Sequence, residues 1–104
     1  MFILYLETPK IGGKLENVTV SEGEEARFVI KLTGGKPKPK VKWFYEEEEI
    51  ITETTELYEV IESEDIITLI VKNVKPTNSG NYYAQLVNDA GQLSSNKAQL
   101  IVNS

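Results

Sequence analysis

The sequence predicts an all-β sandwich of two antiparallel sheets packed around a single tryptophan. Turn residues recur at short intervals, and the segments between them are rich in Val, Ile, Tyr and Thr. In addition, no ten-residue window keeps a helical period. The expected turns lie at Gly12-Gly13, at residues 21–23, at Gly34-Gly35 with the prolines that follow, and at residues 62–65, 76–80 and 88–91.

Alternation of apolar and polar residues assigns an inner face to each strand, because successive side chains point to opposite sides of a sheet. In chain order the inward residues are Leu15, Val18 and Val20 in the second half of the first strand, then Ala26, Phe28, Ile30 and Leu32, Val41 and Trp43, Leu69, Val71 and Val74, Tyr82, Ala84 and Leu86, and Ala98, Leu100 and Val102. Residues 58–61 form a further strand with a less regular pattern. We expect the centre of the core to contain Ile30, Trp43, Leu69, Tyr82 and Ala84.

Composition excludes several classes of function. The chain has 104 residues, enough for one domain of this architecture, and a formal net charge of −5, which disfavours binding to nucleic acid. It contains no cysteine and no histidine, so it lacks disulfides, thiol nucleophiles and the commonest general base. Its paired carboxylates lie in solvated runs, and no glycine-rich loop precedes a helix. We therefore expect no enzyme activity, no cofactor and no metal site.

Two short patterns carry a family resemblance. Trp43 lies between Ile30 and Ala84, and Tyr82 stands two residues before Ala84 in a run that begins Asn78-Ser79-Gly80. An Asn-x-x-Gly pattern follows at residues 88–91. From Pro9 to Val102 the chain resembles the intermediate-set (I-set) immunoglobulin domains of giant muscle proteins of the titin and twitchin type.

The resemblance implies a Greek-key immunoglobulin-like sandwich without its usual disulfide. In immunoglobulin domains two cysteines flank a buried tryptophan, and a corner tyrosine stands two residues before the second cysteine. Here Ile30 and Ala84 occupy the cysteine positions, and Asn78 replaces the aspartate of the family pattern. Packing must therefore replace a bridge that would stabilise the fold by roughly 4 kcal/mol.

The function implied by the resemblance is that of a mechanical spacer and docking module, one repeat of a large cytoskeletal protein of the sarcomere. The lack of cysteine favours a reducing, cytoplasmic compartment. Three alternatives stay open: an extracellular adhesion or receptor domain that binds a protein ligand, a regulatory domain beside a kinase, and a variant from which cysteines were removed. Expected partners are neighbouring domains and other proteins, not nucleic acid or membrane, and the isolated domain should be a monomer.

Two charged runs are candidate protein-binding surfaces. Lysines alternate with prolines and valine before and along the third strand, as a basic ridge for an acidic partner: Lys36, Lys38, Lys40 and Lys42. Four consecutive glutamates follow that strand: Glu46, Glu47, Glu48 and Glu49. Because no glycine is present to take positive φ cheaply, we expect a longer or irregular turn there instead of a tight hairpin. The run also lacks the spaced oxygens and the glycine of calcium loops.

The N-terminal segment stands apart from the family pattern. Residues 2–6 are all apolar but far too few to span a membrane, and no cleavage signal accompanies them. We expect residues 1–8 to be a linker or an extended first strand that is a candidate for strand addition, and residues 9–104 to form the single domain. Asn17 begins an Asn-Val-Thr glycosylation pattern and should face outward, which is compatible with a glycan without requiring one.

Overall fold

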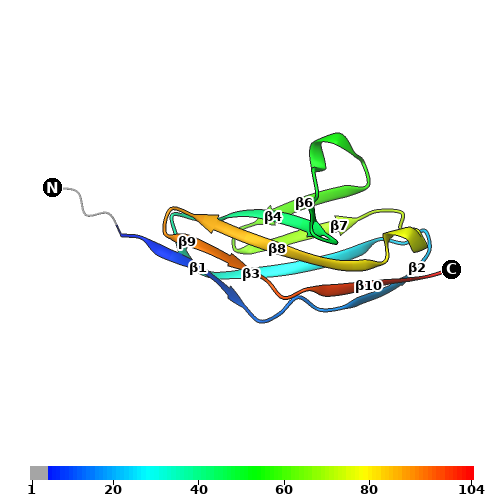
Figure 1. The fold of residues 1–104 in the computed structure, drawn as a ribbon, viewed down its shortest axis with the longest axis horizontal. Coiled ribbons are helices and arrows are strands. Elements are labelled where there is room, and N and C mark those ends of the chain that lie inside the picture. The colour runs from blue at the N-terminus through cyan, green and yellow to red at the C-terminus, as the bar shows by residue number, and fades with distance from the viewer. Residues whose placement is uncertain (1–4) are drawn as a thin grey trace.

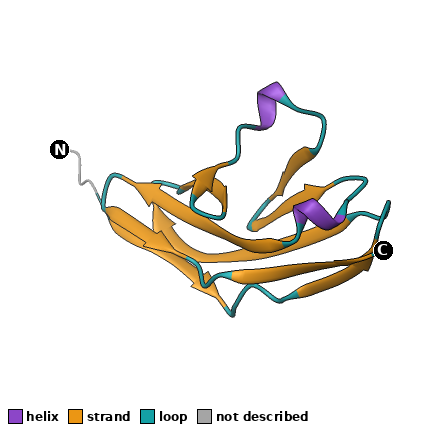
Figure 2. Ribbon diagram, turned by 45° about the vertical axis from the view of Figure 1, so that its right-hand side comes forward, coloured by secondary structure: helices purple, strands orange, loops and turns teal. Residues whose placement is uncertain are grey.

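Ten strands and two short 3-10 turns make up the computed structural model, which describes residues 5–104. Figures 1 and 2 show the strands as two packed layers, with the loop between β5 and β6 projecting from them. The strands are β1 (Glu7–Gly12), β2 (Val18–Ser21), β3 (Ala26–Lys36), β4 (Lys40–Tyr45), β5 (Glu48–Glu49), β6 (Tyr58–Ser63), β7 (Ile66–Val71), β8 (Gly80–Asn88), β9 (Gly91–Ser94) and β10 (Ala98–Asn103). The 3-10 turns are η1 (Thr52–Thr54) and η2 (Pro76–Asn78).

The strand order confirms the predicted immunoglobulin-like sandwich. One sheet has the order β1-β3-β7-β6, and the other has the order β2-β10-β8-β4-β5, with β9 also paired to β8. Every pair is antiparallel except β2 with β10, which is parallel. The predicted first strand is divided between the sheets, because β1 pairs with β3 whereas β2 pairs with β10. Of the apolar N-terminal segment, residues 2–4 lie outside the described residues, and Tyr5 and Leu6 are exposed before β1 begins.

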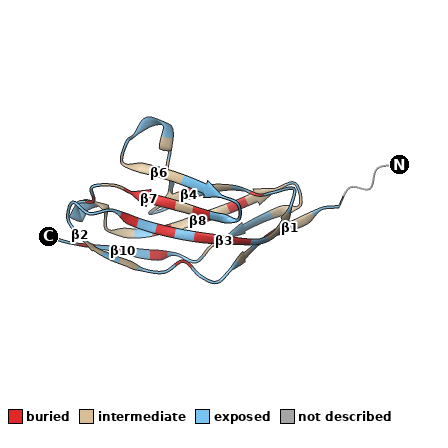
Figure 3. Ribbon diagram, turned by 180° about the vertical axis from the view of Figure 1, so that it is seen from behind, coloured by how far each residue is buried: buried red, intermediate tan, exposed pale blue. Residues whose placement is uncertain are grey.

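The core lies between the two sheets and follows the alternation of the sequence. Along β3, buried and exposed residues alternate from Ala26 to Leu32, as Figure 3 shows. Ile30 and Trp43 are each 2% exposed, and Leu69, Tyr82 and Ala84 are fully buried. The Tyr82 ring lies between two other aromatic rings, with centroids 5.0 Å from Phe28 and 4.8 Å from Tyr45. Its hydroxyl returns to the main chain at the turn before β8, as the resemblance implies.

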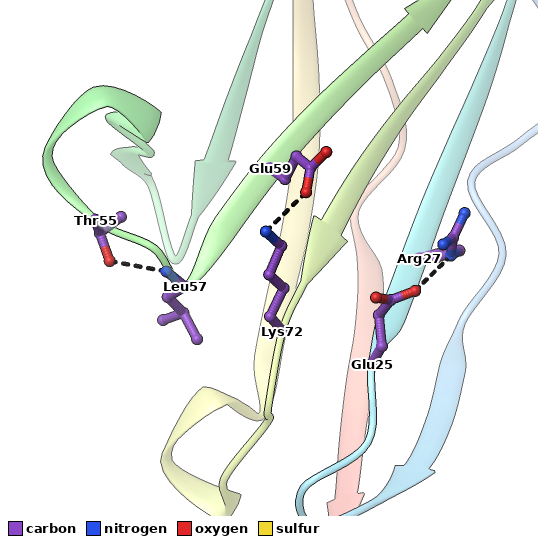
Figure 4. Close-up of polar contacts among 6 residues, drawn as sticks. All are labelled: Glu25, Arg27, Thr55, Leu57, Glu59 and Lys72. Carbon is purple, nitrogen blue, oxygen red and sulfur yellow. Dashed lines mark hydrogen bonds and ion pairs between the residues drawn. The ribbon is translucent and has the colours of Figure 1, made fainter.

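One buried residue, Ile70, points away from this core. It lies on the outer face of the first sheet, yet it is only 3% exposed. Its cross-strand neighbours are Arg27 on β3 and Glu59 on β6, whose long stems lie on either side of it. Both neighbours form exposed ion pairs of 2.7 Å, to Glu25 and Lys72 respectively (Figure 4). Such pairs contribute little on their own, so covering Ile70 is the larger effect of these side chains.

The turn predicted at Gly34-Gly35 with the prolines that follow is confirmed only at the prolines, because β3 continues through both glycines to Lys36 and the chain turns at residues 37–39. β1 pairs with this extension through an irregular register, and the Glu7 carboxylate accepts a 2.6 Å hydrogen bond from the amide of Gly35. Gly35 has φ +126, and a Cβ there would lie 2.7 Å from Pro39 Cγ. The second glycine therefore permits an irregular strand pairing that a larger residue would block.

Asn88 joins three segments at the end of the sandwich where β1 begins. Its side-chain amide donates to the carbonyl of Glu7 at 2.7 Å and to that of Pro37 at 2.9 Å. Its side-chain oxygen accepts from the amides of Ala90 at 2.9 Å and Gly91 at 3.1 Å. One side chain thus connects the entering strand, the β3–β4 loop and the β8–β9 turn.

Candidate protein-interaction surfaces

The last strand of the chain, β10, is held along its length by β2, the second strand. Figure 1 shows the start of β1 and the end of β10 at opposite ends of the long axis. β2 runs parallel to β10, with Val18 opposite Leu100 and Ser21 opposite Asn103, and the amide of Glu22 adds a 2.7 Å bond to the carbonyl of Asn103. β2 and β10 therefore run side by side in the same direction and are joined by hydrogen bonds along their length.

Two asparagine side chains extend this connection beyond the paired residues. Asn96 bonds both main-chain groups of Leu15, accepting from its amide at 2.8 Å and donating to its carbonyl at 3.0 Å. Asn17 accepts a 2.8 Å bond from the amide of Gln99. These bonds satisfy main-chain groups where the chain passes between sheets and no strand partner is available. The role of Asn96 could not be predicted from the sequence, because it depends on the register of β10 against the first strand.

The four glutamates form a tight hairpin, so the longer or irregular turn predicted there is wrong. Phe44 pairs with Glu49 and Tyr45 with Glu48, which leaves Glu46 and Glu47 as a two-residue loop. Both have positive φ, 48° and 74°, as a type I′ turn requires. The amide of Glu46 donates a 3.0 Å hydrogen bond to the Asn81 carbonyl, and the Glu47 carboxylate forms a 3.3 Å ion pair with the Lys97 ammonium. Strand register and these contacts offset the backbone strain.

Three of the four lysines of the predicted ridge line one groove, Lys38, Lys40 and Lys42, and Lys36 lies outside it. The Lys36 ammonium lies 5.2 Å from the centroid of the Tyr5 ring, and Lys38 donates a 3.0 Å bond to the carbonyl of Glu64. Lys40 and Lys42 instead lie on β4, opposite Val87 and Gln85 of β8. A groove of about 530 Å³ is lined by Pro37, Lys38, Lys40, Lys42, Val87, Asn88 and Asp89.

An aromatic pair lies beside Lys42 on the outer face of the second sheet. Phe44 and Tyr83 are cross-strand partners on β4 and β8, and their rings stack at 4.9 Å with an interplanar angle of 6°. The ammonium of Lys97 lies 5.7 Å from the Tyr83 centroid. Phe44, Tyr83 and Lys97 were not among the predicted surface residues. The alternation that places Trp43 and Tyr82 inward nevertheless places Phe44 and Tyr83 outward.

The resolved pKa shifts do not point to acid–base chemistry at neutral pH. The pKa of Glu7 is lowered, chiefly because its carboxylate accepts the hydrogen bond from Gly35, and the pKa of Glu59 is lowered by its hydrogen bond and ion pair with Lys72. Burial raises the pKa of Tyr45, Tyr58 and Tyr82, which keeps their hydroxyls protonated. A general acid at neutral pH needs a carboxyl pKa that is raised.

Within residues 5–104, no group of three or more acidic side chains is arranged to hold a metal ion. No helix in this part of the chain is long and apolar enough to cross a membrane.

The family assignment rests on sequence as well as on this fold. Residues 9–102 match the immunoglobulin I-set domain family. The chain belongs to this family. Human nexilin is 35% identical to this I-set domain over 81 residues, which is 78% of the chain and 12% of nexilin. Titin of Drosophila melanogaster is 37% identical over 87 residues, which is 82% of the chain and a share of that protein that rounds to 0%. The domain thus spans only a small part of these relatives.

Solved structures give the same result for the fold. Titin domain M7 superposes on the I-set domain with a TM-score of 0.87 and 27% identity, covering 97% of this chain and 99% of that one. Titin domains Z1Z2, solved in complex with telethonin, give a TM-score of 0.83 and 30% identity over 98% of this chain and 50% of theirs. The I-set domain is therefore a structural module of the kind found in these muscle proteins.

Proposed function

We propose that this I-set domain is a noncatalytic spacer and docking module in a large cytoskeletal protein of the sarcomere. In this proposal the domain is a monomer in the cytoplasm, joined to neighbouring domains in a tandem array. The similarity to titin and nexilin supports the proposal, and so does the fold's resemblance to titin domains solved as a tandem pair. The observation that carries it is the parallel pairing of β2 with β10, the last strand of the chain.

The spacer role follows from the direction of load. Tension on the two ends pulls β2 and β10 in opposite directions along their common axis. Four residue pairs, the Glu22–Asn103 bond and the asparagine bonds to Leu15 and Gln99 then resist sliding together. Failure requires several of these bonds to break at once, which costs more than opening them one at a time.

Single-molecule force spectroscopy tests this role. A tandem of the domain between well-characterised reference domains is extended at constant velocity, and its unfolding force is compared with that of the double variant Asn17→Ala/Asn96→Ala. We expect the variant to unfold at a clearly lower force, because three bonds near β10 are lost. Asn81→Ala is the matched control, since the Asn81 side chain has no hydrogen bond within residues 5–104 and is exposed. Equal forces for all three proteins would contradict the load-bearing role.

The docking role has a separate test in cells. The domain fused to a fluorescent protein is expressed in striated muscle cells, and its distribution is compared with that of the fluorescent protein alone. Periodic enrichment on sarcomeres supports docking, and a diffuse signal contradicts it. Production through the secretory pathway followed by mass spectrometry addresses the extracellular alternative, because a glycan on Asn17 would favour that alternative.

A further inference from the structure

A row of evenly spaced side chains lies on the outer face of the second sheet. Lys40, Lys42 and Phe44 are alternate residues of β4, so their side chains leave the same face about 7 Å apart. Tyr83 extends the row sideways through its stack with Phe44, and Lys97 lies beyond Tyr83. We call these five residues the aromatic–lysine face.

The face is accessible to a partner. Lys40, Lys42 and Lys97 are exposed, and Phe44 and Tyr83 are partly exposed. The two aromatic side chains are only partly covered, and the lining of the neighbouring groove includes the apolar side chains of Pro37 and Val87. Paired aromatic rings on a surface are favoured contact sites in protein interfaces.

The aromatic–lysine face is basic, although the protein as a whole is acidic. The chain carries a net charge of −5, yet none of the ion pairs found in residues 5–104 involves Lys40 or Lys42. Three acidic residues flank the face: Glu47, which pairs with Lys97 at 3.3 Å, Glu49 opposite Phe44, and Asp89 at the rim of the groove. These acidic residues lie at the edges of the basic region. They would repel an acidic ligand from positions outside the row along β4.

We propose that the aromatic–lysine face binds an acidic peptide segment of a partner protein in extended conformation. Alternate side chains of an extended peptide also repeat at about 7 Å, which is the spacing of Lys40, Lys42 and Phe44. Acidic residues at two alternate positions therefore meet the two lysines, and an aromatic residue at the next alternate position stacks on Phe44 and Tyr83. The recognised pattern is an acidic residue, any residue, an acidic residue, any residue and an aromatic residue.

This inference rests on the docking half of the proposed function, for which it names the site and the class of partner. The spacer half does not depend on it, because β2 and the Asn17 and Asn96 bonds lie outside the face. Force spectroscopy, localisation in muscle cells and peptide binding therefore give three independent readings.

A fluorescein-labelled peptide, Ser-Glu-Ser-Glu-Ser-Phe-Ser, is the probe. Fluorescence anisotropy at low salt should give a Kd on the order of 100 μM, and binding should weaken as salt rises, because exposed charges are screened. A peptide with both glutamates changed to glutamine should bind at least about tenfold more weakly. A peptide with adjacent glutamates, Ser-Ser-Glu-Glu-Ser-Phe-Ser, tests the spacing and should also bind more weakly.

Three variants locate the site. Lys40→Glu/Lys42→Glu should lose at least about tenfold in affinity, because it puts like charges opposite the peptide. Lys14→Glu/Lys31→Glu changes the net charge equally on exposed residues away from the face and should bind much more tightly than the first variant. Glu47→Gln should bind at least as well as the unaltered domain, because Lys97 is released from its ion pair. Circular dichroism and thermal melting confirm that each variant is folded.

Several results would overturn the inference. These are no binding at millimolar domain, equal losses for the two lysine double variants, or self-association of the domain, seen by analytical ultracentrifugation, in place of peptide binding. If the unaltered domain does not bind the probe and sarcomeric localisation persists in Lys40→Glu/Lys42→Glu, docking stands and this site is wrong. If the unaltered domain neither localises to sarcomeres nor binds the probe, the docking role falls together with the site.

Discussion

The hydroxyl of Tyr82 donates a 2.8 Å hydrogen bond to the main-chain carbonyl of Asn78, four residues earlier. The Asn78 side chain accepts a 2.7 Å bond from the amide of Lys75, so the neutral amide still closes η2 where the family pattern has aspartate. Tyr82 is fully buried, and its burial raises the pKa of the hydroxyl, which therefore stays a donor. The Tyr82 side chain thus connects the turn before β8 to the core.

Tyr82→Phe should lower the free energy of unfolding by about 1–2 kcal/mol, because a buried carbonyl loses its partner while the ring packing is kept. Urea denaturation followed by Trp43 fluorescence measures the change. Tyr83→Phe is the control, since the Tyr83 hydroxyl has no hydrogen bond within residues 5–104, and it should stay within about 0.5 kcal/mol. Equal effects of the two substitutions would show that the corner bond is not stabilising.

Glu46→Asn/Glu47→Gly should stabilise the domain by about 1 kcal/mol. Both positions have positive φ, which asparagine and glycine adopt with less strain than glutamate, and the lost Glu47–Lys97 pair is exposed and weak. Thermal unfolding compares this variant with Glu48→Asn/Glu49→Gly, which puts the same residues in β5 and should destabilise. A loss of stability in the first variant would mean that the hairpin is not a type I′ turn.

Ile30→Ala should cost about 2–5 kcal/mol, because Ile30 is buried at a position where the resemblance places a cysteine, and no covalent bond limits the damage. Ile30→Val removes less volume and should cost about 0.5–1.5 kcal/mol. The neighbouring residue Val29 is 48% exposed, so Val29→Ala should have a small effect. Chemical denaturation ranks the three variants, and an equal loss for Ile30→Ala and Val29→Ala would place Ile30 outside the core.

Glu7 should make stability depend on pH in the acidic range. Its folded-state pKa is lowered from 4.5, mainly by the hydrogen bond from Gly35, so its ionised form stabilises the fold above pH 4.5. This contribution is lost as pH falls through the lowered pKa. The melting-temperature difference between the unaltered domain and Glu7→Gln should therefore be largest near pH 6 and should shrink by pH 3. A difference that grows on acidification would contradict this assignment.

Alternation was enough to predict which residues face the core, whereas the immunoglobulin-like topology was implied by the family resemblance. A residue such as Phe28 or Leu100 is inward because of its strand position, and burial of one face fixes that position. The hairpin at Glu46 and the strand through Gly35 were mispredicted, because local turn preferences were outweighed by pairing with β4 and β1. The surface residues were harder to predict, since Lys97 lies over the Tyr83 ring only because of the register of β10 against β8.

The four hydrogen bonds of the Asn88 side chain have a mechanical meaning for whatever chain precedes Glu7. Its amide holds the carbonyl of Glu7 where β1 begins. In the proposed tandem array, a load applied ahead of Glu7 would therefore pass directly to the β3–β4 loop and the β8–β9 turn.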